Sequence, residues 1–215
     1  MIEMHNTDCM GFMRSLPDKA FDLAVADPPY GLPKESSSGS GKLKSRAFNK
    51  GNIARWDVRP GQDYFNELSR VARHQIIFGG NYFPLPPSRG VIAWDKIQPW
   101  KNFSQFELIW TSFDRPAALF RLGNRHGKKI HPTQKPVALY RWLLENYARK
   151  GDRILDTHLG SGSIALACHA LGFDLVGCEI DKGYFDAASE RLALFTRQQH
   201  MGPGARATEC KYESE

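Results

Sequence analysis

The alternation of apolar runs with helical patterns predicts an α/β fold built on a mostly parallel sheet. Apolar runs bounded by turn residues indicate strands, here at residues 21–26, 75–78, 91–94, 107–111, 153–156 and 175–179. Apolar residues that recur at three- and four-residue intervals indicate helices, here at residues 63–72, 137–148, 163–171 and 184–195. Because helices separate most of these strands, we expect a parallel sheet covered by helices.

Two consecutive strands depart from this alternation. No helical pattern separates residues 91–94 from residues 107–111. Since parallel pairing needs a long crossover connection, a strand that returns without one pairs antiparallel. We therefore expect an antiparallel hairpin at one edge of the sheet.

Composition sets limits on the class of protein. The 215 residues suit one α/β domain, which we place at residues 1–197. The formal net charge of +6 favours a polyanionic partner, although ordinary soluble proteins also carry such a charge. The four cysteines show neither a Cys-x-x-Cys pair nor a spacing with histidine that binds zinc, so we expect no metal site and no disulfide framework. The sequence shows no secretory leader and no apolar segment near the roughly 20 residues that span a bilayer, which favours a cytoplasmic protein.

Two segments fall outside the pattern of strands and helices. Residues 33–59 are rich in serine, glycine and basic residues, a composition that cannot bury a core, so we expect a mobile basic loop within the same domain. Residues 198–215 contain a Gly-Pro-Gly-Ala-Arg run and a polar end, so we expect a disordered tail.

A glycine turn between a strand and a helix indicates a nucleotide site. Asp156 ends one predicted strand, and Gly160 and Gly162 precede the next helix. Glycine lets the backbone approach a ligand closely, and open α/β sheets bind ligands beyond the carboxyl ends of their strands. A lone Gly-x-Gly is about as often a simple tight turn. Glu179, at the end of the following strand, favours nucleotide binding because its carboxylate can accept hydrogen bonds from two ribose hydroxyls.

Two common nucleotide sites do not fit this segment. A dinucleotide motif needs a third glycine where Ala165 stands. A triphosphate motif needs Gly-Lys-Ser/Thr after the glycines, and that run is absent from the sequence.

The tetrapeptide Asp27-Pro28-Pro29-Tyr30 follows another predicted strand, so it too lies at a carboxyl edge. Its residues suit methylation of a base amino group, whose lone pair is delocalised into the ring and is therefore a poor nucleophile. The Asp27 carboxylate and the Pro28 carbonyl can accept the two amino hydrogens, and the prolines stiffen the turn. Tyr30 can stack on the base. Methyl transfer from a sulfonium then needs mainly in-line positioning.

At this point the sequence resembles the amino-methylating DNA methyltransferases, whose catalytic motif is Asp/Asn/Ser-Pro-Pro-Tyr/Phe. The tetrapeptide comes early, the glycine-rich motif comes late, and His131-Pro-Thr-Gln-Lys-Pro136 precedes the cofactor strand. This order is similar to that of the permuted beta group, and the resemblance covers most of residues 1–195. It implies a methyltransferase that depends on S-adenosylmethionine and has a Rossmann-like α/β fold. The sheet of that fold has seven strands, is mostly parallel and ends in an antiparallel hairpin.

The resemblance also implies roles for individual residues. The target base would contact the tetrapeptide, Asp27, Pro28, Pro29 and Tyr30. The cofactor pocket would consist of Asp8 at the adenine, Glu179 at the ribose, Asp156, His158, Gly160, Ser161 and Gly162 around the methionine end, and His131, Thr133, Gln134 and Lys135. Asp8 has a second interpretation as the cap of a helix over residues 10–16.

The chain departs from the family pattern at one position of the cofactor loop. The family usually has Asp-Pro-Phe where this chain has Asp156-Thr157-His158. His158 is interpreted as a packed substitute for the aromatic residue, and the alternative is that it weakens cofactor binding.

Other residues are given structural interpretations. We expect Trp94, Trp100 and Trp110, in or beside the hairpin, to pack in the core or at its edge. We expect the cysteines to be core residues, since the Pro-Cys motif of carbon-5 cytosine methylation is absent. The run from Gly79 to Phe83 either borders the base pocket, with Asn81 offering hydrogen bonds, or forms a simple turn. Asp95 and Lys96 also reach the carboxyl edge and are assigned no chemistry.

The leading functional hypothesis is N6-methylation of adenine in double-stranded DNA. The aspartate of the tetrapeptide favours adenine within the family, and serine would favour cytosine N4. Because the amino group lies inside the duplex, the enzyme would flip the base at a cost of roughly a few kcal/mol. Alternatives are a cytosine-N4 enzyme, a methyltransferase acting on protein or RNA, and a catalytically weak nucleic-acid-binding module.

The expected partners follow from this hypothesis. Basic residues of the predicted loop are assigned to DNA binding: Lys42, Lys44, Arg46, Lys50 and Arg55. Two further candidate partners are a second copy of the chain and a cognate restriction endonuclease.

Overall fold

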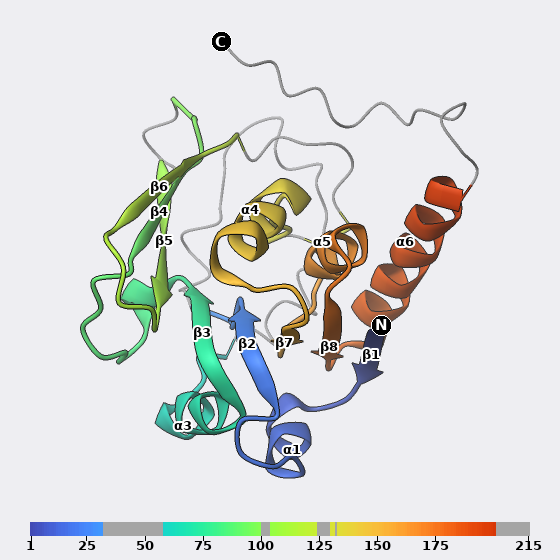
Figure 1. Cartoon of the computed structure of the whole chain (residues 1–215), viewed down its shortest axis with the longest axis horizontal. Helices are drawn as coiled ribbons and strands as arrows, with labels where there is room; N and C mark the ends of the chain where they lie inside the picture. The colour runs from blue at the N-terminus through green and yellow to red at the C-terminus, as the bar shows by residue number, and fades with distance from the viewer. Residues whose placement is uncertain (32–57, 100–103, 124–129, 132, 201–215) are drawn as a thin grey trace.

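A single eight-stranded sheet forms the centre of the computed structural model, which describes residues 1–31, 58–99, 104–123, 130–131 and 133–200. The order across the sheet is β1-β8-β7-β2-β3-β5-β4-β6 (Figure 1). The bounds are β1 Ile2–Asn6, β2 Phe21–Ala26, β3 Ala72–Phe78, β4 Ile92–Asp95, β5 Phe106–Thr111, β6 Ala118–Arg121, β7 Arg153–Asp156 and β8 Asp174–Glu179.

The direction of the strands decides which residues meet at each edge. β1, β8, β7, β2 and β3 are mutually parallel, so their carboxyl ends lie at one edge of the sheet. β5 runs antiparallel to both β3 and β4, so it begins at that same edge. β4, parallel to β6, ends there.

The predicted fold class is confirmed, with one strand more than the expected seven. All six strands predicted from apolar runs are present, and β4 and β5 form the predicted antiparallel pair. The hairpin is not the outermost part of the sheet, because β6 pairs along β4. β1 and β6 had no sequence signal, since both are short outer strands in which half-buried and exposed residues are mixed.

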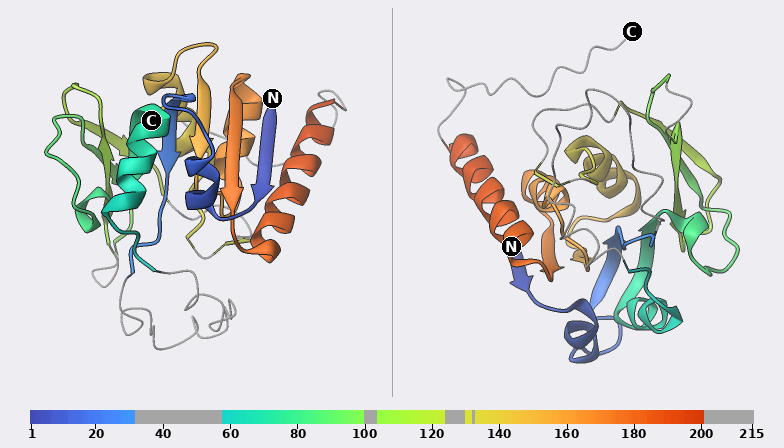
Figure 2. Two further views of the ribbon diagram at one scale, coloured as in Figure 1. Left: turned by 90° about the horizontal axis from the view of Figure 1, so that it is seen from below. Right: turned by 180° about the vertical axis from the view of Figure 1, so that it is seen from behind.

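Helices cover both faces of the sheet (Figures 1 and 2). α1 (Cys9–Arg14) and α3 (Gln62–Val71) pack together on one face. α4 (Val137–Tyr147), α5 (Ser163–Leu171) and α6 (Lys182–His200) cover the other. A short turn of 3₁₀ helix (Gly80–Tyr82) follows β3. The four helices predicted from periodicity are all present, with small shifts at their ends, and Asp181 Oδ1 caps α6 by accepting from the Tyr184 N–H at 3.0 Å.

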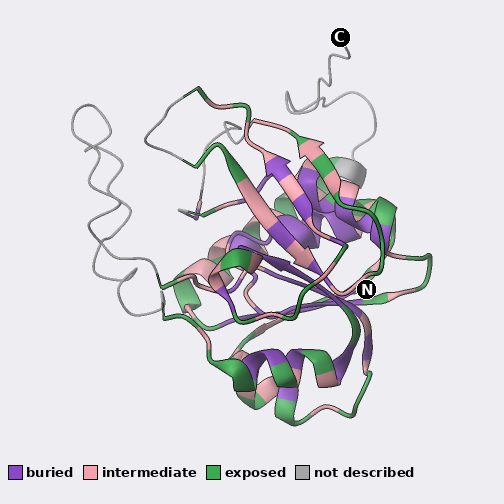
Figure 3. Ribbon diagram, turned by 90° about the vertical axis from the view of Figure 1, so that its left-hand side faces the viewer, coloured by how far each residue is buried: buried purple, intermediate pink, exposed green. Residues whose placement is uncertain are grey.

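Two apolar cores lie between these layers. Val25 and Ile76 point toward α4 and α5, and their neighbours Ala24 and Ile77 point toward α1 and α3. Alternate residues of a strand face opposite sides of a sheet, which explains the near-continuous apolar runs of the inner strands. Figure 3 shows these strands as buried between the helix layers.

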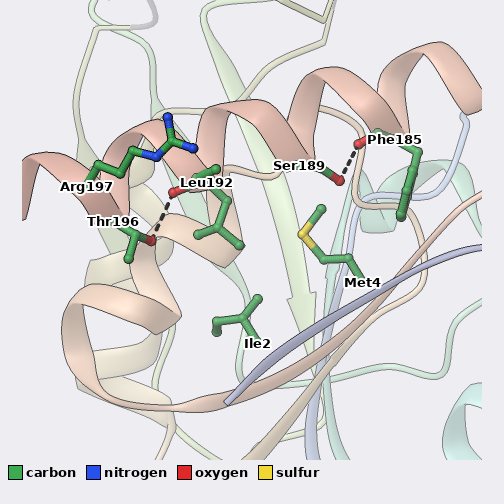
Figure 4. Close-up of a pocket in the computed structure, with 8 residues that line it drawn as sticks. Ile2, Met4, Phe185, Ser189, Leu192, Thr196 and Arg197 are labelled. Carbon is green, nitrogen blue, oxygen red and sulfur yellow. Dashed lines mark hydrogen bonds between the residues drawn. The ribbon is translucent and has the colours of Figure 1, made fainter.

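An apolar hollow of about 480 Å³ lies between β1 and α6. Ile2 and Met4 line it from the strand, and Phe185 and Leu192 line it from the helix (Figure 4). None of the predicted site residues lines this hollow.

Several predictions concern residues that the structure does not describe. Most of the predicted loop at 33–59 is among them, as are Trp100, Cys210 and residues 201–215. α6 continues through His200, three residues beyond the expected domain end at 197. Among the described residues, no helix is long and apolar enough to cross a membrane.

Candidate active site

The carboxyl edge of the sheet gathers the polar residues that the sequence singled out. Asp27 follows β2, Asp156 ends β7 and Glu179 ends β8. Neighbouring parallel strands place these carboxylates side by side, with β7 between the other two strands. This is the edge at which open α/β sheets bind ligands.

Asp27 is held by two hydrogen-bond donors. The Lys135 ammonium lies 2.6 Å from Oδ2, and the Tyr30 hydroxyl lies 2.8 Å from Oδ1. The side chains of Asp27 and Lys135 are only 13% and 6% exposed, so the ion pair is largely shielded from water. Such a pair fixes the orientation of the carboxylate plane.

Glu107, to which the sequence assigned no role, joins this cluster from β5. Its Oε1 lies 3.1 Å from the Lys135 ammonium and 2.7 Å from the Tyr30 hydroxyl. Its Oε2 lies 2.9 Å from the ammonium of Lys96, which follows β4. A sequence signal was available, because an antiparallel strand begins at the edge where parallel strands end, and Glu107 was predicted to start such a strand.

The charges in this cluster shift one another's pKa values. Burial raises the pKa of Asp27, and the nearby Lys135 opposes that rise. Burial would also raise the pKa of Glu107, but the positive charges of Lys135 and Lys96 outweigh it and hold this pKa at about 2. Desolvation disfavours the ammonium of Lys135, yet the two carboxylates raise its pKa above the usual value. Lys135 and Glu107 are therefore both charged at neutral pH.

The Tyr30 ring packs against the turn after β3. Gly79 has a φ of +65°, and a Cβ there would lie 2.5 Å from the Tyr30 ring, so this position requires glycine. Tyr82 stacks on Tyr30 with 4.7 Å between ring centroids, and Phe83 meets it edge-on at 5.9 Å. The run from Gly79 to Phe83 is thus a turn that also borders Tyr30, while Asn81 is exposed.

Glu179 is tied to the glycine loop. Its Oε2 accepts the Gly160 N–H at 2.8 Å, and its Oε1 accepts the Asp181 N–H at 2.9 Å. Burial raises the pKa of Glu179, and these N–H groups counteract the rise. Gly160 has a φ of +50°, and a Cβ there would lie 3.6 Å from the His131 ring. The glycine therefore leaves space between the loop and His131.

His158 is partly buried against an aromatic side chain, which favours its interpretation as a packed substitute. Its ring meets Tyr64 of α3 at 5.5 Å in a T-shaped arrangement, and its Nδ1 lies 2.9 Å from the Thr157 hydroxyl. The same hydroxyl lies 2.6 Å from that of Tyr64. Burial lowers the pKa of His158 to about 4 and raises the pKa of Asp156 to about 8. Asp156 also accepts the His158 N–H at 2.9 Å.

The segment from His131 to Lys135 connects the two halves of the site. His131 is buried beside Tyr184, with 4.3 Å between ring centroids, and its Nδ1 accepts the Thr133 N–H at 3.3 Å. Gln134 turns back on its own segment, where its Oε1 accepts the Ile130 N–H at 3.0 Å. The Lys135 carbonyl accepts the Ser163 hydroxyl at 2.9 Å.

The side chain of Lys135 differs in position from the expectation. It was expected in the cofactor pocket with His131, Thr133 and Gln134, and its backbone does lie against α5 of the cofactor loop. Its ammonium turns instead to Asp27 and Glu107. Two buried carboxylates attract a buried ammonium, whereas the backbone N–H groups of the glycine loop offer it no acceptor.

The remaining predicted residues have local partners. Asp8 caps α1, with its Oδ2 accepting the Gly11 N–H at 2.7 Å, as the helix-cap interpretation expects, and its role at the cofactor adenine stays a prediction. Ser161 Oγ lies 3.1 Å from Ser163 Oγ. Trp94 is fully buried, and Trp110 is partly buried. The predicted DNA-binding residues lie outside the described residues: Lys42, Lys44, Arg46, Lys50 and Arg55.

The cysteines behave as core residues where the structure describes them. Cys168 and Cys178 are buried and Cys9 is partly buried. Burial raises the pKa of both Cys9 and Cys178 to about 12, so their thiols stay protonated at neutral pH. Within the described part of the chain, no group of three or more His, Cys, Asp or Glu side chains is arranged to hold a metal ion.

Comparison with known proteins agrees with this geometry. The family model for N6/N4 DNA methylases matches residues 86–190, which include Glu107, Lys135, Asp156 and Glu179. This match covers just under half of the chain. The family model and the relatives below indicate a DNA amino-methyltransferase, with either adenine N6 or cytosine N4 as the target atom.

Two relatives in sequence align with this chain, one over most of its length and one over a short stretch. YubD of Escherichia coli (strain K12), whose assignment as a methylase is itself provisional, is 25% identical over 91% of this chain and 92% of its own length. The Type II methyltransferase M.HpaI of Haemophilus parainfluenzae is 42% identical over 65 residues, which cover 30% of this chain and 21% of M.HpaI.

Solved methylase structures share the fold. The M1.HpyAVI complex with S-adenosylmethionine matches with a TM-score of 0.58 and 18% identity, covering 89% of this chain and 99% of that one. The cytosine-N4-specific PvuII DNA methyltransferase matches with a TM-score of 0.61 and 13% identity over 92% of each chain. TTHA0409 of Thermus thermophilus, also complexed with S-adenosylmethionine, matches with a TM-score of 0.59 and 17% identity. The match covers 95% of this chain and 96% of that one. The expected S-adenosylmethionine-dependent methyltransferase fold is thereby confirmed.

Proposed function

We propose that this protein transfers a methyl group from S-adenosylmethionine to the N6 amino group of adenine in double-stranded DNA. The observation that carries the proposal is the placement of Asp27 beside Tyr30, at the edge where Glu179 anchors the glycine loop. Lys135 links these two halves through its ammonium and its backbone carbonyl. A methyl donor bound at the loop and a base held by the tetrapeptide would meet at this edge.

The residues at the loop fit S-adenosylmethionine. An ionised carboxylate offers about four acceptor positions, and the described N–H bonds use two of those on Glu179, so the others suit a ribose diol. The space that a Cβ at Gly160 would fill, beside His131, admits a ligand close to the backbone. The pKa of Asp156 is about 8, and a nearby cation would favour the ionised form of this carboxylate. The methionine end of the cofactor carries such charges.

The chain's own residues would position the target base. Asp27 accepts one amino hydrogen and the Pro28 carbonyl accepts the other, which favours a more pyramidal and more nucleophilic nitrogen. The Tyr30 ring supports the base by stacking. The bound cofactor supplies a methyl group on a sulfonium, whose sulfur keeps the bonding electrons when the carbon–nitrogen bond forms. The nitrogen then releases one proton, for which the ionised Asp27 is the nearest acceptor.

The choice of adenine rests on Asp27. A carboxylate accepts hydrogen bonds only, whereas the serine that favours cytosine N4 within the family both donates and accepts. The cytosine-N4 reaction is the second candidate, since the PvuII enzyme of that specificity shares the fold. The two reactions give different methylated nucleosides and are separable by one measurement.

We also propose that the basic loop contacts DNA. Gly31 and Arg59, described residues on either side of its lysines, lie together, since a Cβ on Gly31 would meet the Arg59 Cβ at 3.0 Å. The Arg59 Nε donates to the Tyr30 carbonyl at 3.0 Å. The described residues that flank the loop therefore lie beside the tetrapeptide, at which we place the flipped base. Its basic residues are the ones assigned above, from Lys42 to Arg55.

Labelled methyl transfer tests the proposal directly. The purified protein is incubated with S-adenosylmethionine labelled in its methyl group and with unmethylated double-stranded DNA, RNA or a protein mixture. We expect label in DNA alone and N6-methyladenine after nucleoside digestion. N4-methylcytosine would establish the second candidate, label in RNA or protein would assign another substrate class, and cofactor binding without any transfer would indicate a catalytically weak binding module.

A further inference from the structure

Glu107 is a nearly buried carboxylate that the proposed mechanism does not use. Only 10% of its side chain is exposed, yet both of its oxygens have charged partners, Lys135 on one and Lys96 on the other. Burying a carboxylate costs free energy unless it is paired, and an apolar residue could fill the same place at the start of β5. The pattern of its contacts indicates what the carboxylate does there.

Glu107 and Asp27 share the same two donors. Lys135 lies 2.6 Å from Asp27 and 3.1 Å from Glu107, and the Tyr30 hydroxyl lies 2.8 Å and 2.7 Å from them. The ammonium has three N–H groups and can serve both carboxylates at once. A hydroxyl has one proton and can donate fully to only one of them. The Tyr30 proton is thus divided between Glu107 and Asp27.

We propose that Glu107 is a positioning residue for methyl transfer, which draws Lys135 and the Tyr30 hydroxyl partly away from Asp27 and so keeps that carboxylate free and basic enough to bind the target amino group. This inference rests on the proposed function. A neutral side chain at position 107 would attract both donors less strongly and leave them mainly to Asp27. Its Oδ1 would then be occupied by the Tyr30 proton when the base arrives.

Lys96 completes the arrangement from the neighbouring strand. It pairs with Glu107 Oε2, on the oxygen that faces away from the shared donors. Its charge lowers the pKa of Glu107, which keeps that carboxylate ionised. The two lysines and the two carboxylates together carry no net charge, so the cluster can be buried without a large desolvation cost.

Glu107 shifts the pKa of Asp27 in a definite direction. Glu107 raises the pKa of Asp27, whereas Lys135 and the Tyr30 hydroxyl lower it. Other ionisable groups face the cluster from α3, α4 and β7, namely Tyr64, Tyr140 and Asp156. These groups are present in the wild type and in the position-107 variant alike. Loss of the Glu107 charge therefore moves the pKa of Asp27 downward, and loss of the Tyr30 hydroxyl moves it upward.

The test uses Glu107→Gln, which keeps the shape and removes the charge, in the full chain with S-adenosylmethionine and DNA. We expect kcat to fall about tenfold or more, the scale of one charge-assisted hydrogen bond. The acid limb of the kcat–pH profile should shift to lower pH, and cofactor affinity should stay within about threefold of wild type. Tyr30→Phe should shift the acid limb to higher pH.

A double variant and a matched control complete the experiment. If Glu107 acts through the shared hydroxyl, Glu107→Gln costs less in the Tyr30→Phe background than in the wild type. The control is Asp95→Asn on neighbouring β4, whose carboxylate pairs with exposed Arg121 and does not touch Asp27. It should leave kcat and the acid limb unchanged.

The outcomes separate this inference from the proposed function. Absence of methyl transfer to DNA by the wild-type protein overturns the proposed function. With an active wild type, unchanged turnover in Glu107→Gln overturns the inference, and so does a fall in kcat without a shift of the acid limb, which would indicate a structural role only. If Glu107→Gln does not fold, an unshifted acid limb in Tyr30→Phe overturns the shared-donor arrangement.

Discussion

Lys135 and Asp27, which are 108 positions apart in the sequence, form a buried ion pair with 2.6 Å between Nζ and Oδ2. The pair joins the segment before α4 to the turn after β2. Because the same lysine bonds to α5 through its backbone, a displacement of the cofactor loop would be passed to the catalytic turn. In the proposed mechanism, this connection is a physical route by which cofactor binding orders the base pocket.

Substitution of Asp27 tests the catalytic assignment. We expect Asp27→Ala to abolish methyl transfer and to leave S-adenosylmethionine binding nearly intact, because the carboxylate lies on the base side of the site. Lys135 keeps Glu107 as a partner in this variant, so the fold should persist. Calorimetric cofactor binding and labelled transfer, measured on the same preparation, check both halves. Near-wild-type turnover would remove Asp27 from the mechanism.

Substitutions in the glycine loop test the cofactor site. Glu179→Ala removes an acceptor for the Gly160 and Asp181 N–H groups as well as for the ribose, so we expect affinity to fall by roughly 1.5–3 kcal/mol. Gly160→Leu places a side chain in strained backbone against His131 and should also weaken binding. Glu190→Ala, an exposed carboxylate on α6, is the control. Unchanged calorimetric affinity in both loop variants would place the cofactor elsewhere.

The carboxyl-edge residues were accessible from sequence because each follows a recognisable strand. Asp27, Asp156 and Glu179 come directly after apolar runs, and parallel pairing brings such ends together. The edge position of Glu107 and Lys96 was also predictable, but the contact of Glu107 with Lys135 and Tyr30 was not, because it depends on β5 being the strand that pairs with β3. The direction of the Lys135 side chain was likewise set by a tertiary partner, because local sequence does not show where a buried ammonium finds its counterions.

His158 links cofactor-loop packing to acid stability. Its folded pKa is about 4, below the ordinary value of 6.5, because burial disfavours the charged ring. The unfolded chain therefore binds more protons between about pH 6.5 and 4, and stability falls as the pH drops through that window. We expect His158→Phe to lose less stability over it than the wild type. His131, whose pKa is also near 4, maintains the remaining sensitivity.

The same variant decides between the two interpretations of His158. Phenylalanine can keep the edge contact with Tyr64, so cofactor affinity should remain within about threefold of wild type. His158→Ala loses that contact and should be less stable at every pH. Thermal melts from pH 4 to 8 and calorimetry with S-adenosylmethionine supply both measurements. A large gain in affinity for His158→Phe would show instead that the histidine weakens the cofactor site.

The last prediction concerns the basic loop, whose flanking residues lie against the tetrapeptide. Replacement of Lys42, Lys44 and Arg46 by neutral residues should weaken DNA binding. Each basic residue that no longer neutralises a phosphate lowers the slope of log affinity against log salt by about 0.9 on duplex DNA, so the slope should also become shallower. Cofactor affinity should barely change, because the loop rejoins the domain at Tyr30 and not at Glu179.

A matched triple variant controls for net charge. Arg149 and Lys150 are exposed in the turn that leads into β7, at the amino edge of the sheet and opposite the site, and Arg141 is exposed on α4. Their replacement removes the same charge at a distance from the proposed DNA path. We expect this control to change the salt slope much less than the loop variant does. If the loop variant binds DNA with wild-type affinity and slope, its charges serve solubility, and the DNA surface must be sought along residues 112–129.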